Sequence, residues 1–281
     1  MRVGSLFTGY GGLDIAVGGD LAWYAEIEPA ACQVLAHHYP DVPNLGDITA
    51  INWAEVEPVD IITGGYPCQP FSHAGNRKGK NDERHLWPNV LTAIRAIRPS
   101  YAILENVSGH ITLGFADVLA DLAQIGWDAE WGTFRASDVG APHRRERIFI
   151  VATNPSGDGH GQQLHARGMA SVEGQAKGDT QQRQRTRRQF DSRGSDFWGK
   201  YGPAITCWEL TIGRLAPAPT VKRSDKRRLN PQFVEWMMGL PDGWVTGHGL
   251  SAAKELKMLG NGVVPQQAHA AIAQLMQRVQ P

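Results

Sequence analysis

Residues 2–17, RVGSLFTGYGGLDIAV, decide the fold class, because they carry a strand, a glycine turn and a helix in immediate succession. Arg2–Phe7 has the short apolar character of a strand, and a helix begins at Leu13 after two adjacent glycines. Glycines at such a turn let the backbone approach a ligand, and the N-terminus of the following helix attracts polar groups. The glycines alone fit a purely structural tight turn equally well.

The rest of the first half repeats this alternation of short apolar runs and amphipathic runs. Strands that alternate with helices predict βαβ units in a doubly wound α/β sheet. A final amphipathic helix follows Pro265, and Asn230-Pro231 has the form of a helix cap. The expected strands are residues 21–27, 59–63, 101–104 and 148–152, and the expected helices are residues 29–38, 86–97 and 115–125.

Composition limits the class of protein. The 281 residues are 42% hydrophobic, and no run approaches the roughly 18 apolar residues of a membrane span. The N-terminus lacks the basic-then-apolar pattern of a signal peptide, so we expect a cytoplasmic protein. The three cysteines have no C-x-x-C spacing, so we expect neither a disulfide framework nor a metal site.

The charges are segregated along the chain although the formal net charge is zero. Residues 155–228 contain 14 Lys and Arg against 7 Asp and Glu, so the remainder is acidic. A polyanionic partner needs a basic face, not a basic average, but a solvated insert fits the charges equally well. Residues 154–196 are rich in Gly, Gln, Ser and Arg, and we expect them to be loop.

Cys68 stands between two prolines directly after the expected strand at residues 59–63. The carboxyl end of a strand in an open α/β sheet is where a nucleophile is typically placed. An isolated Pro-Cys is more often a structural loop residue, so the cysteine needs support from other groups. The polar segment His73–His85 contains two glycines and has the composition of a lid.

Two further groups carry charge at strand ends. Glu105 follows the strand at residues 101–104, where partial burial would raise its pKa and suit it to general acid chemistry. Arg145 and Arg147 precede residues 148–152, and in a strand they would point to the same face and bind an oxygen. A turn acid and a basic edge strand are the structural alternatives.

The order of these motifs resembles that of the C5-cytosine DNA methyltransferase family along nearly the whole chain. The glycine turn is similar to the family's F-x-G-x-G-G, and the cysteine segment to its P-C-Q. The later motifs resemble E-N-V, Q-x-R-x-R and G-N-x-V-x-P. The matching segments are Phe7–Gly12, Pro67–Gln69, Glu105–Val107, Arg145–Arg147 and Gly260–Pro265.

The resemblance implies a role for each catalytic residue. Cys68 would add to C6 of a cytosine flipped out of the duplex, and Glu105 would engage N3. Arg145 and Arg147 would contact the flipped base, with Arg147 the better candidate for O2. The segment 72–85 would close over that base. The DNA-contacting residues would be Gln69, Ser72, Arg77, Lys78, Asn106 and His143.

The resemblance also implies S-adenosylmethionine as the cofactor, without a metal. A carboxylate at Glu26 can accept hydrogen bonds from ribose hydroxyls. Residues 46–48 are expected to end a third strand region, where Asp47 can bind an adenine amino group. The residues expected to bind the cofactor are Phe7, Gly9, Gly11, Gly12, Leu13, Glu26, Ile27, Asp47, Ile48, Pro67, Leu86, Asn261 and Val263.

The implied architecture is a Rossmann-like catalytic domain, residues 1–153 with 252–281, and a smaller inserted target-recognition domain, residues 154–251. We expect a monomeric bacterial or phage enzyme that binds double-stranded DNA. A cognate restriction endonuclease would be its companion, although the sequence does not establish that one exists, nor which site is recognised.

Three positions depart from the family pattern. His143 stands where Q-x-R-x-R begins, Tyr10 replaces a small residue in the glycine turn, and Ile27 stands where some relatives have an aromatic residue. Other functions remain open: a tRNA cytosine-5 methyltransferase of the same fold and a non-catalytic DNA-binding module. A nicotinamide dehydrogenase is disfavoured, because the glycine spacing is not G-x-G-x-x-G.

Overall fold

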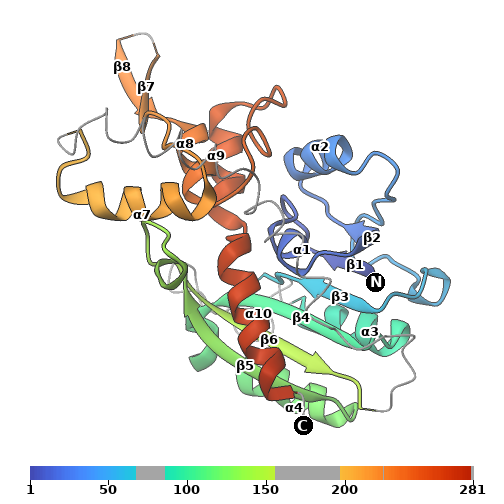
Figure 1. Cartoon of the computed structure of the whole chain (residues 1–281). Coiled ribbons are helices and arrows are strands. Elements are labelled where there is room, and N and C mark those ends of the chain that lie inside the picture. The colour runs from blue at the N-terminus through green and yellow to red at the C-terminus, as the bar shows by residue number, and fades with distance from the viewer. Residues whose placement is uncertain (68–85, 156–196, 224, 280–281) are drawn as a thin grey trace.

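The computed structural model describes residues 1–67, 86–155, 197–223 and 225–279. A six-stranded sheet in the order β2-β1-β3-β4-β6-β5 forms its centre (Figure 1). The first four of these strands are parallel, and β6 runs antiparallel to both of its neighbours. The predicted doubly wound α/β fold is confirmed. The strands are β1 (Arg2–Leu6), β2 (Asp20–Ala25), β3 (Ile61–Gly64), β4 (Tyr101–Val107), β5 (Asp128–Arg135) and β6 (Glu146–Thr153).

Helices cover both faces of the sheet (Figure 1). Ile61 and Ile103 point to the face that carries α1 and α10, whereas Ile62 and Leu104 point to the face that carries α3 and α4. This alternation follows from the two-residue repeat of a strand, and it buries both faces. The helices are α1 (Gly12–Val17), α10 (Pro265–Val279), α3 (Trp87–Ile97) and α4 (Phe115–Gln124).

Two features of the sheet differ from the expectation. Residues 46–48 form no strand, and Asn44, shortly before them, makes an isolated bridge to Tyr24 of β2. β5 was not predicted. It is the edge strand of the sheet, and its eight residues are all exposed or half-buried. An edge strand therefore lacks the continuous apolar run by which the buried strands were found.

A smaller group of elements follows the sheet in sequence and stands beside it (Figure 1). A second hydrophobic cluster joins this group to the first half of the chain, because Tyr10 and Val34 pack with Trp208 and Trp236. The smaller group therefore does not have a core of its own. Its elements are α7 (Gly202–Ile212), β7 (Thr220–Arg223), β8 (Lys226–Leu229), α8 (Pro231–Met237) and α9 (Ala252–Asn261), and Val34 belongs to α2 (Pro29–His38).

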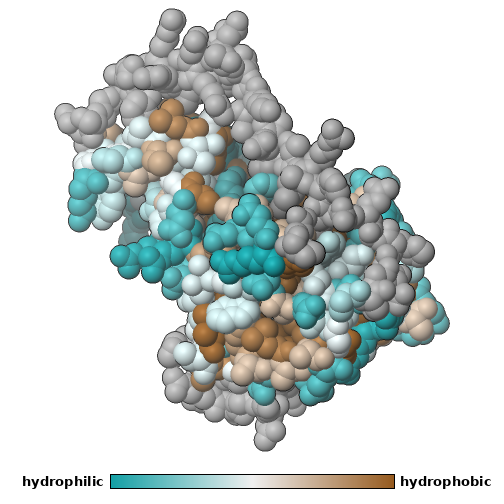
Figure 2. Space-filling view, turned by 60° about the horizontal axis from the view of Figure 1, so that its bottom comes forward, coloured by the Kyte–Doolittle hydropathy of each residue, from teal (hydrophilic) through white to brown (hydrophobic). Residues whose placement is uncertain are grey.

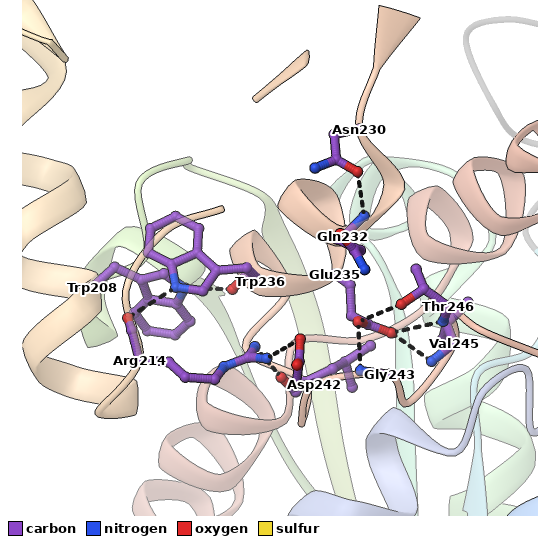
Figure 3. A network of polar contacts seen from close by, with 11 residues as sticks. Trp208, Arg214, Asn230, Gln232, Glu235, Trp236, Asp242, Gly243, Val245 and Thr246 are labelled. Carbon is purple, nitrogen blue, oxygen red and sulfur yellow. Dashed lines mark hydrogen bonds and ion pairs between the residues drawn. The ribbon is translucent and has the colours of Figure 1, made fainter. Parts of the chain in front are cut away.

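A polar network holds the smaller group together (Figure 3). The Asn230 side chain accepts a hydrogen bond from Gln232 N at 3.2 Å, so the predicted cap of α8 is confirmed. Trp208 donates to the Trp236 carbonyl at 2.9 Å, and Trp236 in turn donates to the Arg214 carbonyl at 3.1 Å. The buried indoles are thus satisfied, as large polar-tipped aromatic side chains require.

Glu235 is the acceptor at the centre of this network (Figure 3). Its fully buried carboxylate accepts hydrogen bonds from the backbone N–H groups of Gly243, Val245 and Thr246 and from the Thr246 hydroxyl. A buried carboxylate is tolerated only when donors replace its hydration. This side chain therefore fixes the loop between α8 and α9.

The surface is mixed in character. The face in Figure 2 has hydrophobic side chains gathered in its lower half and hydrophilic ones above them. Trp131 on β5 is among the exposed large apolar side chains, at 39%, and packs edge-on against Phe115. None of the described helices is long and apolar enough to span a bilayer.

Replacing Glu235 by Ala is expected to lower the free energy of unfolding by at least about 3 kcal/mol, because three backbone donors and a hydroxyl lose a charged acceptor. Asp242→Asn is the matched control, since Asp242 is largely exposed and its carboxylate contacts only Arg214 in the described structure. It should cost less than about 1 kcal/mol. Urea unfolding measures both, and equal losses would contradict the central role of Glu235.

Candidate active site

The glycine turn between β1 and α1 is closed by the C-terminal part of the chain. The Tyr10 hydroxyl donates to the Val263 carbonyl at 2.7 Å. A Cβ atom on Gly12 would lie 2.4 Å from that carbonyl oxygen, and one on Gly262 would lie 1.9 Å from the Tyr10 ring. These two positions require glycine for close approach, so the first and last motifs pack directly on each other.

A cavity of about 720 Å³ opens at this junction, at the carboxyl ends of β1 and β3. Ligands typically bind at this position in open α/β sheets. Ten of the thirteen residues expected to bind a cofactor line the cavity. They are Phe7, Gly9, Gly12, Leu13, Glu26, Ile27, Pro67, Leu86, Asn261 and Val263.

Glu26 and Ile27 form one side of the cavity. The Glu26 carboxylate accepts hydrogen bonds from Gly9 N at 2.8 Å, Ile27 N at 2.9 Å and Glu28 N at 2.8 Å. These bonds fix the carboxylate and still leave acceptor capacity. Ile27 is 66% exposed, which is unusual for a large apolar side chain bordering a cavity. This wall combines a fixed acceptor with an open apolar surface.

Three residues expected at the cofactor do not line the cavity: Gly11, Asp47 and Ile48. Asp47 is exposed, and hydrogen bonds from the backbone N–H and hydroxyl of Thr49 hold its pKa below the ordinary value. Ile48 is buried in the core between the sheet and α3. The sequence placed this segment at the end of a strand, and the difference arises because the segment forms none.

Sequence reasoning missed several residues that line the cavity. Asp14 is buried, accepts hydrogen bonds from the hydroxyls of Ser5 and Thr63, and has a pKa raised by burial. Lys254 and Lys257 reach the cavity from α9, and Lys257 pairs with Glu28 at 3.2 Å. Two features of the sequence could have identified these residues: an acid in the first turn of a helix, Asp14, and hydroxyl groups in the buried strands β1 and β3, Ser5 and Thr63.

Glu105 lines the same cavity and forms an ion pair with Arg147. Arg147 Nε lies 3.0 Å from Glu105 Oε1, and Glu105 is 8% exposed. β4 and β6 pair so that both side chains point to the face that carries α10. Burial raises the pKa of Glu105, while the charges of Arg147 and Arg145 oppose that rise. Glu105 therefore takes up a proton more readily than an exposed carboxyl group does.

Asn106 and His143, both expected to contact DNA, have internal partners. The buried Asn106 amide donates to the Tyr66 carbonyl at 3.0 Å and so holds the segment that leads to Pro67. The His143 ring bonds to the Met237 carbonyl at 3.0 Å, and burial lowers its pKa. Both side chains support neighbouring segments of the site.

Arg145 and Arg147 do not share the arrangement that the sequence predicted. β6 begins at Glu146, and Arg145 before it has a positive φ of 34°. Strand alternation therefore does not apply to the pair. The guanidinium of Arg145 donates to the carbonyls of Gly260 and Gly262.

Five predicted site residues lie outside the described part of the chain. They are Cys68, Gln69, Ser72, Arg77 and Lys78, and the expected lid at residues 72–85 lies there too. Pro67, the residue before Cys68 in sequence, lines the cavity that Glu105 borders.

Comparison with known proteins identifies the family. A family model described as C-5 cytosine-specific DNA methylase matches residues 1–183. The chain belongs to this family. It is similar to the Type II methyltransferase M.NlaIV of Neisseria lactamica, with 37% identity over 46% of the chain and 33% of that protein. It is also similar to the Type II methyltransferase M.AquIA of Picosynechococcus sp., with 35% identity over 52% of the chain and 69% of that protein.

Solved structures share the fold. The S. pombe Dnmt2 methyltransferase has a TM-score of 0.65 and 19% identity, with complete coverage of both chains. The Entamoeba histolytica methyltransferase EhMeth has a TM-score of 0.65 and 17% identity, with coverage of 100% of this chain and 99% of the other. The family match covers mainly the sheet, and the aligned part amounts to about a third of M.NlaIV.

The raised pKa of Glu105 has a measurable consequence. A carboxyl group with a folded-state pKa above its unfolded-state value holds its proton more tightly when folded, so stability falls as pH rises from about 4.5. Glu105→Gln should remove this contribution and lose less free energy of unfolding between pH 4.5 and 7 than the wild type. Urea unfolding at a series of pH values tests this, and parallel curves would contradict it.

Proposed function

We propose that this member of the family transfers a methyl group from S-adenosylmethionine to C5 of a cytosine flipped out of double-stranded DNA. The observation that carries the proposal is the ion pair of Arg147 with the buried Glu105, which lines the same cavity as the predicted cofactor residues. Pro67 of the P-C-Q motif lines that cavity as well. An acid, a cation and a cofactor cavity are thus brought together next to the segment that carries the nucleophile.

The cavity fits S-adenosylmethionine in chemistry as well as in position. A fixed carboxylate at Glu26 suits ribose hydroxyls, and the open apolar side chain of Ile27 with Phe7 suits an adenine ring. Asn261 and Val263 would complete the lining of the cavity. The bound cofactor would supply an electrophilic methyl group.

The chain's own residues would supply the remaining chemistry. The Cys68 thiolate would form a bond to C6 of cytosine while Glu105 holds a proton at N3 and Arg147 a positive charge near O2. The electron pair would move to C5, which would accept the methyl group while the S–CH3 bond of the donor breaks and S-adenosylhomocysteine leaves. Loss of the C5 proton to a base and breaking of the C6–S bond would return the thiolate and release 5-methylcytosine.

The β7–β8 hairpin supports a polyanionic partner. It projects from the molecule at the end away from the sheet (Figure 1). Lys222, Lys226, Arg227 and Arg228 are exposed, and none of them pairs with an acidic side chain of the described residues. A two-stranded ribbon fits the major groove of DNA, and cations contact phosphates. We assign residues 154–251 to the recognition of the duplex.

Methyl transfer from labelled S-adenosylmethionine to duplex DNA tests the reaction directly. Wild-type protein should label DNA, and labelling confined to tRNA would contradict the proposed substrate. Cys68→Ser should abolish turnover while DNA binding is kept, because the hydroxyl is a much weaker nucleophile than a thiolate.

Glu105→Gln tests the proposed role of Glu105 as the proton donor. It should lower kcat by about 10²–10⁴-fold with little change in the Kd of DNA. Wild-type turnover in either the Cys68 or the Glu105 variant would exclude the proposed mechanism.

Replacing the four exposed hairpin cations by Gln should weaken DNA binding and flatten its dependence on salt. The slope of log K against log salt should fall by about 0.9 for each DNA phosphate that the variant no longer neutralises. Arg95→Gln is the control, since Arg95 is an exposed cation on α3 and far from the hairpin along the chain. An unchanged slope in the hairpin variant would remove the hairpin from the DNA interface.

A further inference from the structure

Arg145 binds a different part of the protein from its neighbour Arg147. One nitrogen of its guanidinium, Nη2, donates to the Gly260 carbonyl at 3.0 Å and to the Gly262 carbonyl. Burial lowers its pKa, and the nearby Arg147 lowers it further. Removing a cation from water costs free energy, and hydrogen bonds to fixed acceptors offset that cost. The two carbonyls are such acceptors, so Arg145 is tied to the segment that carries them.

Gln267 on α10 holds the backbone of the same residue. Its side-chain amide donates to the carbonyls of Arg145 and Phe134, each at 2.8 Å. Gln267 is 1% exposed, and Arg145 has the left-handed φ of 34° that is strained for a residue with a side chain. The contacts of the side chain and of the backbone together specify this conformation.

These contacts join the two halves of the proposed site. Asn261 and Val263, on either side of Gly262, line the cofactor cavity. Arg147, two residues beyond Arg145 in sequence, pairs with Glu105 on the neighbouring strand. The segment that lines the cofactor cavity is therefore linked to Glu105 through the guanidinium of Arg145 and the backbone from Arg145 to Arg147.

We propose that Arg145 and Gln267 are positioning residues that clamp the cofactor-binding turn at the end of α9 (residues 260–263) to the strand that carries Arg147. The clamp couples occupation of the cofactor cavity to the geometry of the base-binding pair. Cofactor binding would order the turn and, through Arg145, the start of β6, so the cofactor and DNA would each strengthen the binding of the other. The coupling rests on the proposed function, whereas the clamp itself does not.

The first experiment measures native-state amide hydrogen exchange without any ligand. Arg145→Met should lose protection at residues 260–264 by at least about tenfold, because the carbonyls of Gly260 and Gly262 lose the guanidinium that donates to them. Gln267→Leu should lose protection at residues 134–136 and 145–147. Arg145→Lys should restore part of the protection of the turn, since an ammonium group still donates to a carbonyl. Unchanged exchange in both Arg145→Met and Gln267→Leu would overturn the clamp.

The second experiment measures the Kd of S-adenosylhomocysteine by calorimetry and the Kd of duplex DNA with and without it. Arg145→Met should raise the cofactor Kd by roughly fivefold to tenfold and reduce the mutual enhancement toward one. Arg147→Met should lower kcat and leave the cofactor Kd within about twofold, which a merely structural loss would not do. Arg95→Met should match the wild type in every measurement.

The outcomes separate the clamp from the proposed function. Wild-type protein that binds neither S-adenosylhomocysteine nor DNA, together with the expected changes in hydrogen exchange, would support the clamp and exclude the methyltransferase. Methyl transfer by the wild type together with an unchanged cofactor Kd and unchanged coupling in Arg145→Met would overturn the coupling. Far-ultraviolet circular dichroism and urea midpoints verify that each variant is folded.

Discussion

The site depends on one close packing contact, the contact of the first glycine turn with the last motif of the chain. The Tyr10 hydroxyl donates to the Val263 carbonyl, while Gly12 and Gly262 leave no room for a Cβ atom between these segments. Residues from the first and last motifs thereby form adjoining walls of one cavity. Any side chain at either glycine would push these walls apart, because packed interiors transmit such displacements. The tyrosine that departs from the family pattern makes this contact.

The charged groups around that cavity are arranged at some cost to stability. Burial raises the pKa of both Asp14, at the start of α1, and Glu105, on β4. Asp14 is satisfied by two hydroxyls, and Glu105 by the guanidinium of Arg147. Such groups commonly mark functional sites, since burying a carboxyl is otherwise unfavourable. Glu235, outside the cavity, is also a buried carboxylate, but backbone N–H groups donate to it, so it fixes a loop.

Much of the fold could be predicted because the buried strands have unmistakable apolar runs. Residues 61–64 and 101–107 were located to within a few positions, and the cap at Asn230 was located correctly. The edge strand Asp128–Arg135 escaped prediction because its residues are exposed or half-buried. The segment at Asp47 was misplaced for a related reason: short polar stretches next to a sheet carry no periodicity that distinguishes a strand from a loop.

The sequence by itself determined the order of the motifs, because glycines, prolines and strand-end acids have local signatures. The resemblance of these motifs to the family then implied ten of the residues that line the cavity. Only the tertiary structure decided what the two arginines contact. Arg147 meets Glu105 through the pairing of β4 with β6, and Arg145 turns to Gly260 and Gly262 on the last motif. Contacts between residues so far apart in sequence depend on strand register and backbone dihedral angles, which no local pattern of side chains specifies.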